Sequence, residues 1–145
     1  FVVRGPDEGL KEKVKKLKGN EKRIILMPET RDRTEILKMY QAADIFVMPS
    51  YREGLPLTMF EAMASGLPVV ATPVNGIPFE MKSPENGFLI KYGDNKGFKE
   101  AIMKLLKNPE LREQISNNNI QRSKNYKWES IAEKTLKLYN SVLKN

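Results

Sequence analysis

Two carboxylates flank the start of an apolar stretch in the middle of the chain. Glu53 and Glu61 lie within REGLPLTMFEAMASGLPVV, residues 52–70. Gly54 and Pro56 break any helix that would run through Glu53, so we expect Glu53 in a loop and Glu61 inside the helix that follows. That helix is apolar at most other positions. A carboxylate buried there needs hydrogen-bond donors, because burying an unpaired charge is strongly unfavourable.

Two interpretations of Glu61 are open. It either meets an arginine or backbone amides in a purely structural role, or it accepts hydrogen bonds from two vicinal hydroxyls such as those of a ribose. Free N–H groups between Gly54 and Leu57 would form an anion site suited to a phosphate. Glu61 follows at roughly 7.5 Å, at 1.5 Å per helical residue, which is about the separation of diphosphate and ribose in a nucleotide. The spacing favours a ligand and leaves the structural role open.

Composition narrows the possible chemistry. The 145 residues are 40% hydrophobic and 30% charged, which is ordinary for one soluble globular domain. The chain has no Cys and no His, which removes disulfides, thiol ligands and the commonest general base. No apolar run is long enough to cross a bilayer, and no signal peptide is recognisable. The net charge of +7 allows an anionic partner, but a solvated lysine surface is the simpler explanation.

The elements that must position the two carboxylates alternate between strands and helices. Continuous apolar runs closed by Gly or Pro are typical of strands covered on both faces. This order predicts an α/β fold of the doubly wound class, a Rossmann-like parallel sheet followed by C-terminal helices. Ligands of such sheets bind beyond the carboxyl ends of the strands, and Glu53 follows one of those ends. The predicted strands are Phe1–Arg4, Arg23–Met27, Asp44–Met48, Pro68–Ala71 and, after a turn, the end of Asn86–Ile90.

Helical periodicity fills the remaining segments. One helix follows the first strand and ends before Gly19, and a second starts at about Thr34 as its N-cap. The others are expected at about Pro56–Ser65, Lys96–Leu106, Pro109–Lys124 and Trp128–Leu143.

Other segments receive simpler interpretations. Gly5–Gly9 is read as a turn rather than a phosphate loop, since Pro6 lacks an N–H donor. TPVNGIP, residues 72–78, is expected to be a loop. Asn117–Asn119 is read as a polar helix face or a frayed stretch of helix, with no function assigned. Trp128 and Tyr139 are expected to anchor the last helix onto the domain.

The central stretch is similar to the C-terminal domain of group 1 (family 4) glycosyltransferases. The matching residues are MPSYREGLPLTMFEAMASGLPVVATPVNGIPFEM and ENGFLIKYGD, with seven residues between Glu53 and Glu61. LKMYQAADIFVMPS resembles the family's helix and strand before this motif, and KWESIAEKTLKLYNSVL resembles its closing helix. The resemblance covers nearly the whole chain.

The resemblance implies a GT-B fold, two Rossmann-like domains with the active site between them. Residues 1–145 would form a single nucleotide-sugar-binding domain, the second of the two, as a fragment without its first strand segment and without the N-terminal acceptor domain. The full-length enzyme would be a retaining, metal-independent hexosyltransferase that moves a sugar from a UDP- or GDP-sugar to a hydroxyl acceptor. The isolated fragment would be inactive, and no cofactor is implied.

The resemblance also implies roles for individual residues. Glu53 would be the catalytic residue beside the transferred sugar, and Glu61 would take the ribose hydroxyls. The implied donor-binding residues are Gly54, Leu55, Pro56 and Glu61, with Met27 and Pro28 near the base. The family's diphosphate-clamping Arg and Lys have no counterpart here, and Glu80 is displaced by one position from the family's Glu, so no role is carried over to it.

The alternative functions are a nucleotide-sugar epimerase or phosphorylase on the same fold, or a basic, non-catalytic nucleic-acid- or partner-binding α/β module. The context of the two glutamates argues against the first pair, and the scattered lysines without an RNA-binding signature argue against the module. The expected partners are a nucleoside-diphosphate sugar and, through the N-terminal domain, an acceptor glycan or lipid-linked sugar, with no nucleic acid. The expected location is the cytoplasm, with peripheral contact at the inner face of the membrane as an option.

Overall fold

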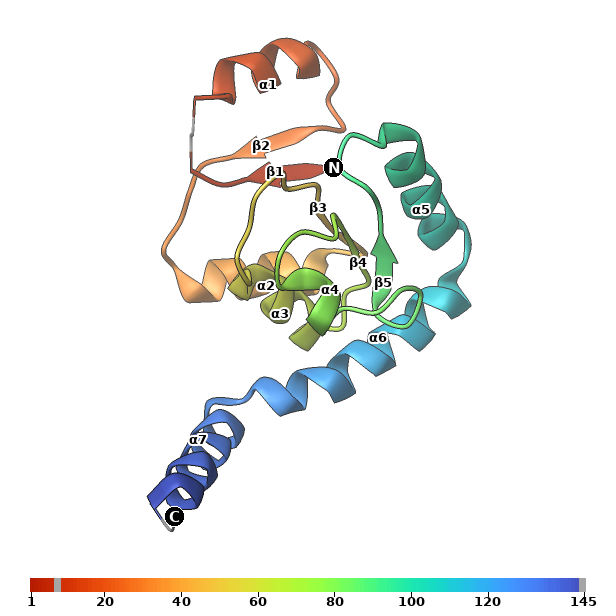
Figure 1. Cartoon of the computed structure of the whole chain (residues 1–145). Coiled ribbons are helices and arrows are strands. Elements are labelled where there is room, and N and C mark those ends of the chain that lie inside the picture. Colours follow the sequence, from red (N-terminus) through yellow and green to blue (C-terminus); the bar gives the residue numbers. More distant parts are fainter. Residues whose placement is uncertain (7–8, 144–145) are drawn as a thin grey trace. The chain divides into compact units, whose positions relative to one another are not determined.

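The computed structural model describes residues 1–6 and 9–143 (Figure 1). The chain divides into two compact units, Phe1–Lys38 and Met39–Asn145. Asp7 and Glu8, and with them the centre of the turn predicted over Gly5–Gly9, lie outside the described residues. The elements in chain order are β1 (Val2–Arg4), α1 (Lys11–Lys18), β2 (Ile25–Met27), α2 (Arg33–Ala42), β3 (Phe46–Met48), α3 (Leu57–Ala64), β4 (Val69–Ala71), α4 (Ile77–Glu80), β5 (Gly87–Leu89), α5 (Asn95–Lys107), α6 (Pro109–Ser123), the 3-10 helix η1 (Lys124–Tyr126) and α7 (Trp128–Leu143).

The first unit is a β-α-β arrangement. β1 and β2 pair in parallel, with Val3 opposite Leu26, and α1 connects them along the chain. The next helix, α2, begins at Arg33, and Asp32 accepts the backbone N–H of Thr34 through Oδ1 at 2.8 Å. The prediction that Thr34 is the N-cap is therefore wrong, because the aspartate two residues earlier supplies the capping oxygen.

The second unit contains a parallel sheet in the order β3-β4-β5. Its central strand, β4, is fully buried, as the uninterrupted apolar run predicts. Val69 and Ala71 point into one apolar cluster together with residues of α3, whereas Val70 points into a second cluster with residues of α5. This alternation along the strand places one core on each face of the sheet. The sheet is thus covered on both sides.

The fold class predicted from the sequence is confirmed: the chain is an α/β protein with parallel strands and C-terminal helices. Within the described residues the strands form one sheet of two strands and one of three. Helix α3 starts one residue after Pro56, whose extended backbone (φ −71°, ψ 125°) makes it the N-cap. One short helix, α4, occupies the end of the predicted loop 72–78, with Pro78 in its first turn.

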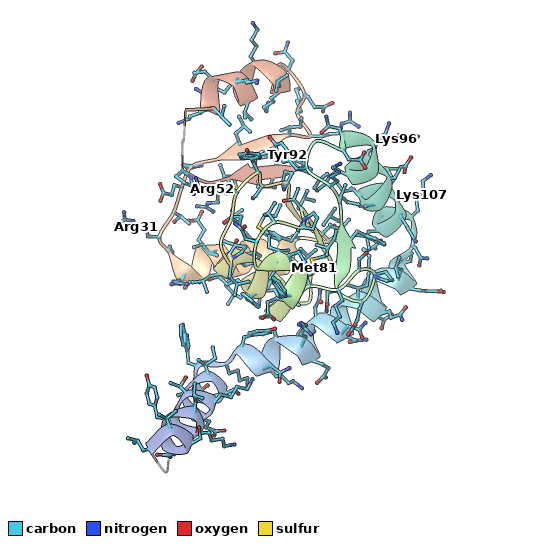
Figure 2. The ribbon with its side chains drawn as sticks, in the orientation of Figure 1. Arg31, Arg52, Met81, Tyr92, Lys96 and Lys107 are labelled. Atoms are coloured by element: carbon cyan, nitrogen blue, oxygen red, sulfur yellow. The ribbon has the colours of Figure 1, made fainter. Side chains whose placement is uncertain are left out.

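Side chains of the second unit range from fully buried to fully exposed (Figure 2). Met81 is fully buried and belongs to the cluster packed against α3. Lys96 and Lys107, near the two ends of α5, point outward and are exposed. This agrees with the interpretation of many lysines as a solvated surface.

The last helix contributes nothing to the core among the described residues. Trp128 is 77% exposed and Tyr139 is 61% exposed, and α7 has no buried residue. Figure 1 shows α7 in the darkest blue, after α6 along the chain. The prediction that these two aromatic residues anchor α7 onto the domain is wrong for this structure. Within residues 1–6 and 9–143, no helix is both long and apolar enough to cross a membrane.

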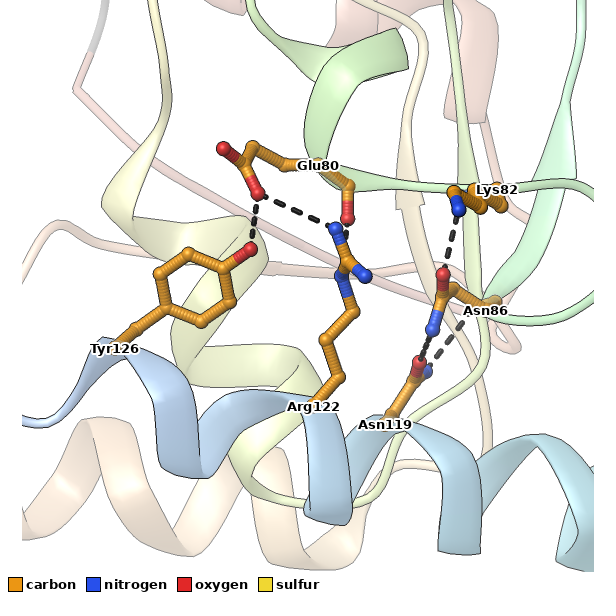
Figure 3. A network of polar contacts seen from close by, with 6 residues as sticks. All are labelled: Glu80, Lys82, Asn86, Asn119, Arg122 and Tyr126. Atoms are coloured by element: carbon orange, nitrogen blue, oxygen red, sulfur yellow. Dashed lines mark hydrogen bonds and ion pairs between the residues drawn. The ribbon is translucent and has the colours of Figure 1, made fainter.

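A buried pair of asparagines ties α6 to the residues that come just before β4 and β5 (Figure 3). The Asn119 Nδ2 donates to the carbonyl oxygens of Leu67 at 2.8 Å and Asn86 at 3.0 Å. The Asn86 Nδ2 in turn donates to the Asn119 Oδ1 at 2.8 Å. The interpretation of Asn117–Asn119 as a polar helix face is therefore wrong for Asn119, which is fully buried.

The same figure shows how α6 holds α4. The Arg122 Nε donates to the Glu80 carbonyl oxygen at 2.7 Å, and its Nη2 lies 3.3 Å from the Glu80 carboxylate. The Tyr126 hydroxyl donates to the same carboxylate, and burial together with this bond raises the pKa of Tyr126. These contacts give Glu80 a structural role at the junction of α4 and α6.

Candidate functional site

The loop between β3 and α3 carries Glu53, as predicted. It leaves the carboxyl end of β3 at Met48 and is held at its start by the residue directly after β4, because the Thr72 Oγ1 donates to the Ser50 carbonyl oxygen at 2.5 Å. The Ser50 Oγ donates to Glu53 Oε1 at 3.1 Å. This hydrogen bond orients one carboxylate oxygen of Glu53, and the Glu53 side chain is half-buried.

A second loop, between β4 and α4, fastens the backbone around Glu53. The Asn75 Nδ2 donates to the Glu53 carbonyl oxygen, and the Gly76 N–H donates to the Gly54 carbonyl oxygen at 3.1 Å. A Cβ atom at Gly76 would lie 3.0 Å from that same oxygen and 3.0 Å from a methyl carbon of Leu55. Glycine thus allows the two loops to approach this closely.

The N-terminus of α3 lies between the two carboxylates. Its N-cap, Pro56, has no side-chain oxygen, and within the described part of the chain no side chain caps this end and no acidic residue lies in its first turn. The first N–H groups of a helix have no partner inside the helix and carry partial positive charge. Leu55 and Leu57 are 48% and 66% exposed, so this positive end opens toward solvent. An anionic group can bind there.

Glu61 lies farther along α3, as predicted, and its carboxylate meets a tyrosine. The Tyr40 hydroxyl, from α2, donates to Glu61 Oε2 at 3.1 Å. Burial and the nearby Glu61 carboxylate raise the pKa of Tyr40, so this phenol stays protonated and remains a donor. Tyr40 thus orients one oxygen of Glu61. No local sequence pattern predicts this pair, because α2 and α3 meet only through tertiary packing.

The remaining predicted residues lie elsewhere or offer no ligand cluster. Met27 and Pro28 are at the carboxyl end of β2 in the first unit, so the site is built here from the second unit alone. Their contact with the base stays a prediction. Among the residues that the structure describes, no group of three or more Asp, Glu, His or Cys side chains is arranged to hold a metal ion.

This arrangement occurs in a chain whose sequence is similar to a known family. Residues 1–122 match the family model of glycosyl transferases group 1. The chain belongs to the group 1 glycosyltransferases. A curated relative, D-inositol 3-phosphate glycosyltransferase from Corynebacterium glutamicum (strain R), is 32% identical over 127 residues, which are 88% of this chain and 30% of that protein. This group 1 glycosyltransferase chain therefore spans less than a third of the relative's length.

Solved structures agree with the family assignment. The C-terminal domain of LpcC from Francisella tularensis, a glycosyl transferase group 1 family protein, is 32% identical with a TM-score of 0.71, over 81% of this chain and 60% of that one. A TarM variant from S. aureus, solved with fondaparinux, alpha-GlcNAc-glycerol and UDP, is 30% identical with a TM-score of 0.83, over 97% of this chain and 29% of that one. The group 1 chain therefore has the fold of a GT-B C-terminal domain.

Proposed function

We propose that this chain is the donor-binding domain of a retaining glycosyltransferase that moves a sugar from a UDP- or GDP-sugar to a hydroxyl acceptor. The observation that carries the proposal is the placement of Glu53 and Glu61 on either side of the uncapped N-terminus of α3, in a chain of the group 1 family. The UDP in the TarM structure supports a nucleotide donor. The family match favours transfer over epimerisation or phosphorolysis.

The donor would lie along α3. Glu61 would accept hydrogen bonds from the two ribose hydroxyls, with Tyr40 keeping its carboxylate in position. The N–H groups from Gly54 to Leu57 would bind the diphosphate. As the sugar leaves, negative charge grows on the diphosphate, and oriented amides at a helix N-terminus stabilise such charge without having to reorganise.

Glu53 would lie beside the transferred sugar. The bond between the anomeric carbon and the diphosphate oxygen breaks with its electron pair on the diphosphate. The acceptor hydroxyl oxygen bonds to the same face of the sugar, and its proton passes to the departing diphosphate oxygen. Positive charge develops on the sugar ring during such a transfer, and a carboxylate at close range stabilises it. The Ser50 hydroxyl, 3.1 Å from Glu53 Oε1, orients that carboxylate.

Residues 1–145 would act as one nucleotide-sugar-binding domain, with Met27 and Pro28 near the base. The acceptor, a glycan or a lipid-linked sugar, would be bound by a partner domain. The reaction would take place in the cytoplasm or at the inner face of the membrane.

Replacing Glu61 by Ala is expected to weaken nucleotide binding by about 1–3 kcal/mol, the range for a hydrogen bond to a charged group. The reason is that the ribose loses its carboxylate partner. Calorimetric titration of the full-length enzyme with UDP and GDP measures the change. Glu100→Ala, which removes an exposed carboxylate on α5, is the matched control. Unchanged affinity for the preferred nucleotide would contradict the ribose assignment, and a wild type that binds neither nucleotide would contradict the proposed function.

A further inference from the structure

Two consecutive residues hold two consecutive carbonyl groups in the Glu53 loop. Asn75 donates from its side chain to the Glu53 carbonyl, and Gly76 donates from its backbone to the Gly54 carbonyl. The Asn75 backbone has φ 45°, in the left-handed region, which asparagine tolerates better than most residues. This conformation is what brings the side chain and the next N–H to adjacent carbonyls. We call these two residues the Asn75–Gly76 clamp.

The clamp determines where the next two N–H groups point. In a planar trans peptide, the C=O and the N–H of the same unit point in opposite directions. The Glu53 carbonyl shares its peptide with the Gly54 N–H, and the Gly54 carbonyl shares its peptide with the Leu55 N–H. Because both carbonyls face the clamp, both N–H groups face away from it. Apart from Gly54 and its two neighbours in the chain, no atom of the described residues lies within 4 Å of the position that a Gly54 Cβ would occupy, and Gly54 is exposed.

We propose that Asn75 is a positioning residue for donor binding: its side-chain amide turns the Gly54 and Leu55 N–H groups toward the diphosphate and sugar oxygens of the nucleotide sugar. This inference rests on the proposed function. Asn75 touches no ligand itself, and its effect passes through the peptide units on either side of Gly54. Asparagine is suited to the task because it combines a left-handed backbone with an N–H donor, whereas glycine lacks the donor and aspartate presents only acceptors.

Two substitutions separate the donor from the backbone conformation. Asn75→Asp keeps the shape of the side chain but sets a carboxylate against the Glu53 carbonyl. Asn75→Gly keeps the left-handed backbone and removes the donor. Asn118→Asp is the matched control, because the Asn118 Nδ2 also donates to a backbone carbonyl, that of Glu85 at 3.0 Å, from α6. The three variants are made in the full-length enzyme and compared with the wild type.

The test compares a ligand that has phosphates with one that has none. UDP binding is measured by calorimetry, and uridine binding is measured by its competition with UDP; GDP and guanosine replace them if the wild type prefers guanine. We expect both Asn75 variants to weaken UDP binding about tenfold, as for a lost interaction with a charged group. Uridine binding should match the wild type, because the ribose contact at Glu61 is untouched. Asn118→Asp should leave both affinities unchanged.

Each other result decides against the inference. Equal losses for UDP and uridine would show a general structural role for Asn75, and unchanged UDP binding would show that the clamp does not orient these N–H groups. If Asn75→Asp fails to fold, Asn75→Gly decides the question, since glycine adopts this backbone without strain. A wild type that binds neither UDP nor GDP overturns the proposed function, and the inference with it. Normal wild-type binding with unaffected Asn75 variants overturns the inference alone.

Discussion

Glu53→Gln is expected to lower the turnover of the full-length enzyme by at least about 100-fold, the scale of losing one electrostatic contact to the transition state. Glutamine keeps the size of the side chain and can still accept the Ser50 hydroxyl, so the loop has no reason to move. What is lost is the negative charge beside the sugar, where positive charge develops. Because this charge matters only as the sugar leaves, nucleotide affinity should be nearly kept.

Steady-state transfer kinetics and calorimetry with the nucleoside diphosphate together test this expectation. Glu85→Gln, which removes the charge of an exposed carboxylate in the same unit, is the control and should leave turnover unchanged. Wild-type turnover in Glu53→Gln would remove Glu53 from the reaction. A parallel loss of nucleotide affinity would instead assign Glu53 to donor binding.

Asn119→Leu is expected to destabilise the chain by about 3–5 kcal/mol, because it leaves several buried polar groups without partners. Leucine is close to asparagine in size but cannot pair with the carbonyls of Leu67 and Asn86 or with the Asn86 side-chain amide. Figure 3 shows that Asn119 joins α6 to the segment around Asn86. The loss should therefore weaken the packing of α6 on the rest of the second unit.

Urea unfolding followed by circular dichroism measures this loss as a shift of the midpoint. The control is Asn117→Leu, two positions earlier on the same helix, where the side chain is exposed. An effect on the midpoint as small as that of Asn117→Leu would show that the buried asparagine pair contributes little to stability.

Local signals were sufficient for the elements that carry the two carboxylates. Gly54, Pro56 and Gly66 mark the ends of α3, and these residues act through their own backbone restrictions, which do not depend on the rest of the fold. The positions of Glu53 in a loop and Glu61 in a helix follow from them. Five short apolar runs likewise predict five strands, each within two residues of its observed end.

Contacts between segments far apart in the sequence could not be predicted from such local signals. Asn117, Asn118 and Asn119 look alike in the sequence, yet of these three only Asn119 is fully buried, and its partners Leu67 and Asn86 are 52 and 33 residues away. Tyr40 and Asn75 were missed for the same reason, since each acts on a glutamate about 22 residues away. The prediction for Trp128 was wrong in the other sense: burial was expected and the side chain is exposed. An aromatic residue on an amphipathic helix favours burial, but the local sequence does not say which surface will cover it.

The short span between the Glu53 loop and its clamp has a consequence for how the site forms. The bonds from Asn75 to Glu53 and from Thr72 to Ser50 each join residues 22 positions apart. The chain-entropy cost of closing a loop rises only slowly with its length, and contacts between near neighbours in sequence form early in folding. The segment from β3 to the clamp can therefore assemble as a unit before α6 arrives, and the geometry around Glu53 is set within about 30 residues of chain, a span typical of one strand–helix–strand unit.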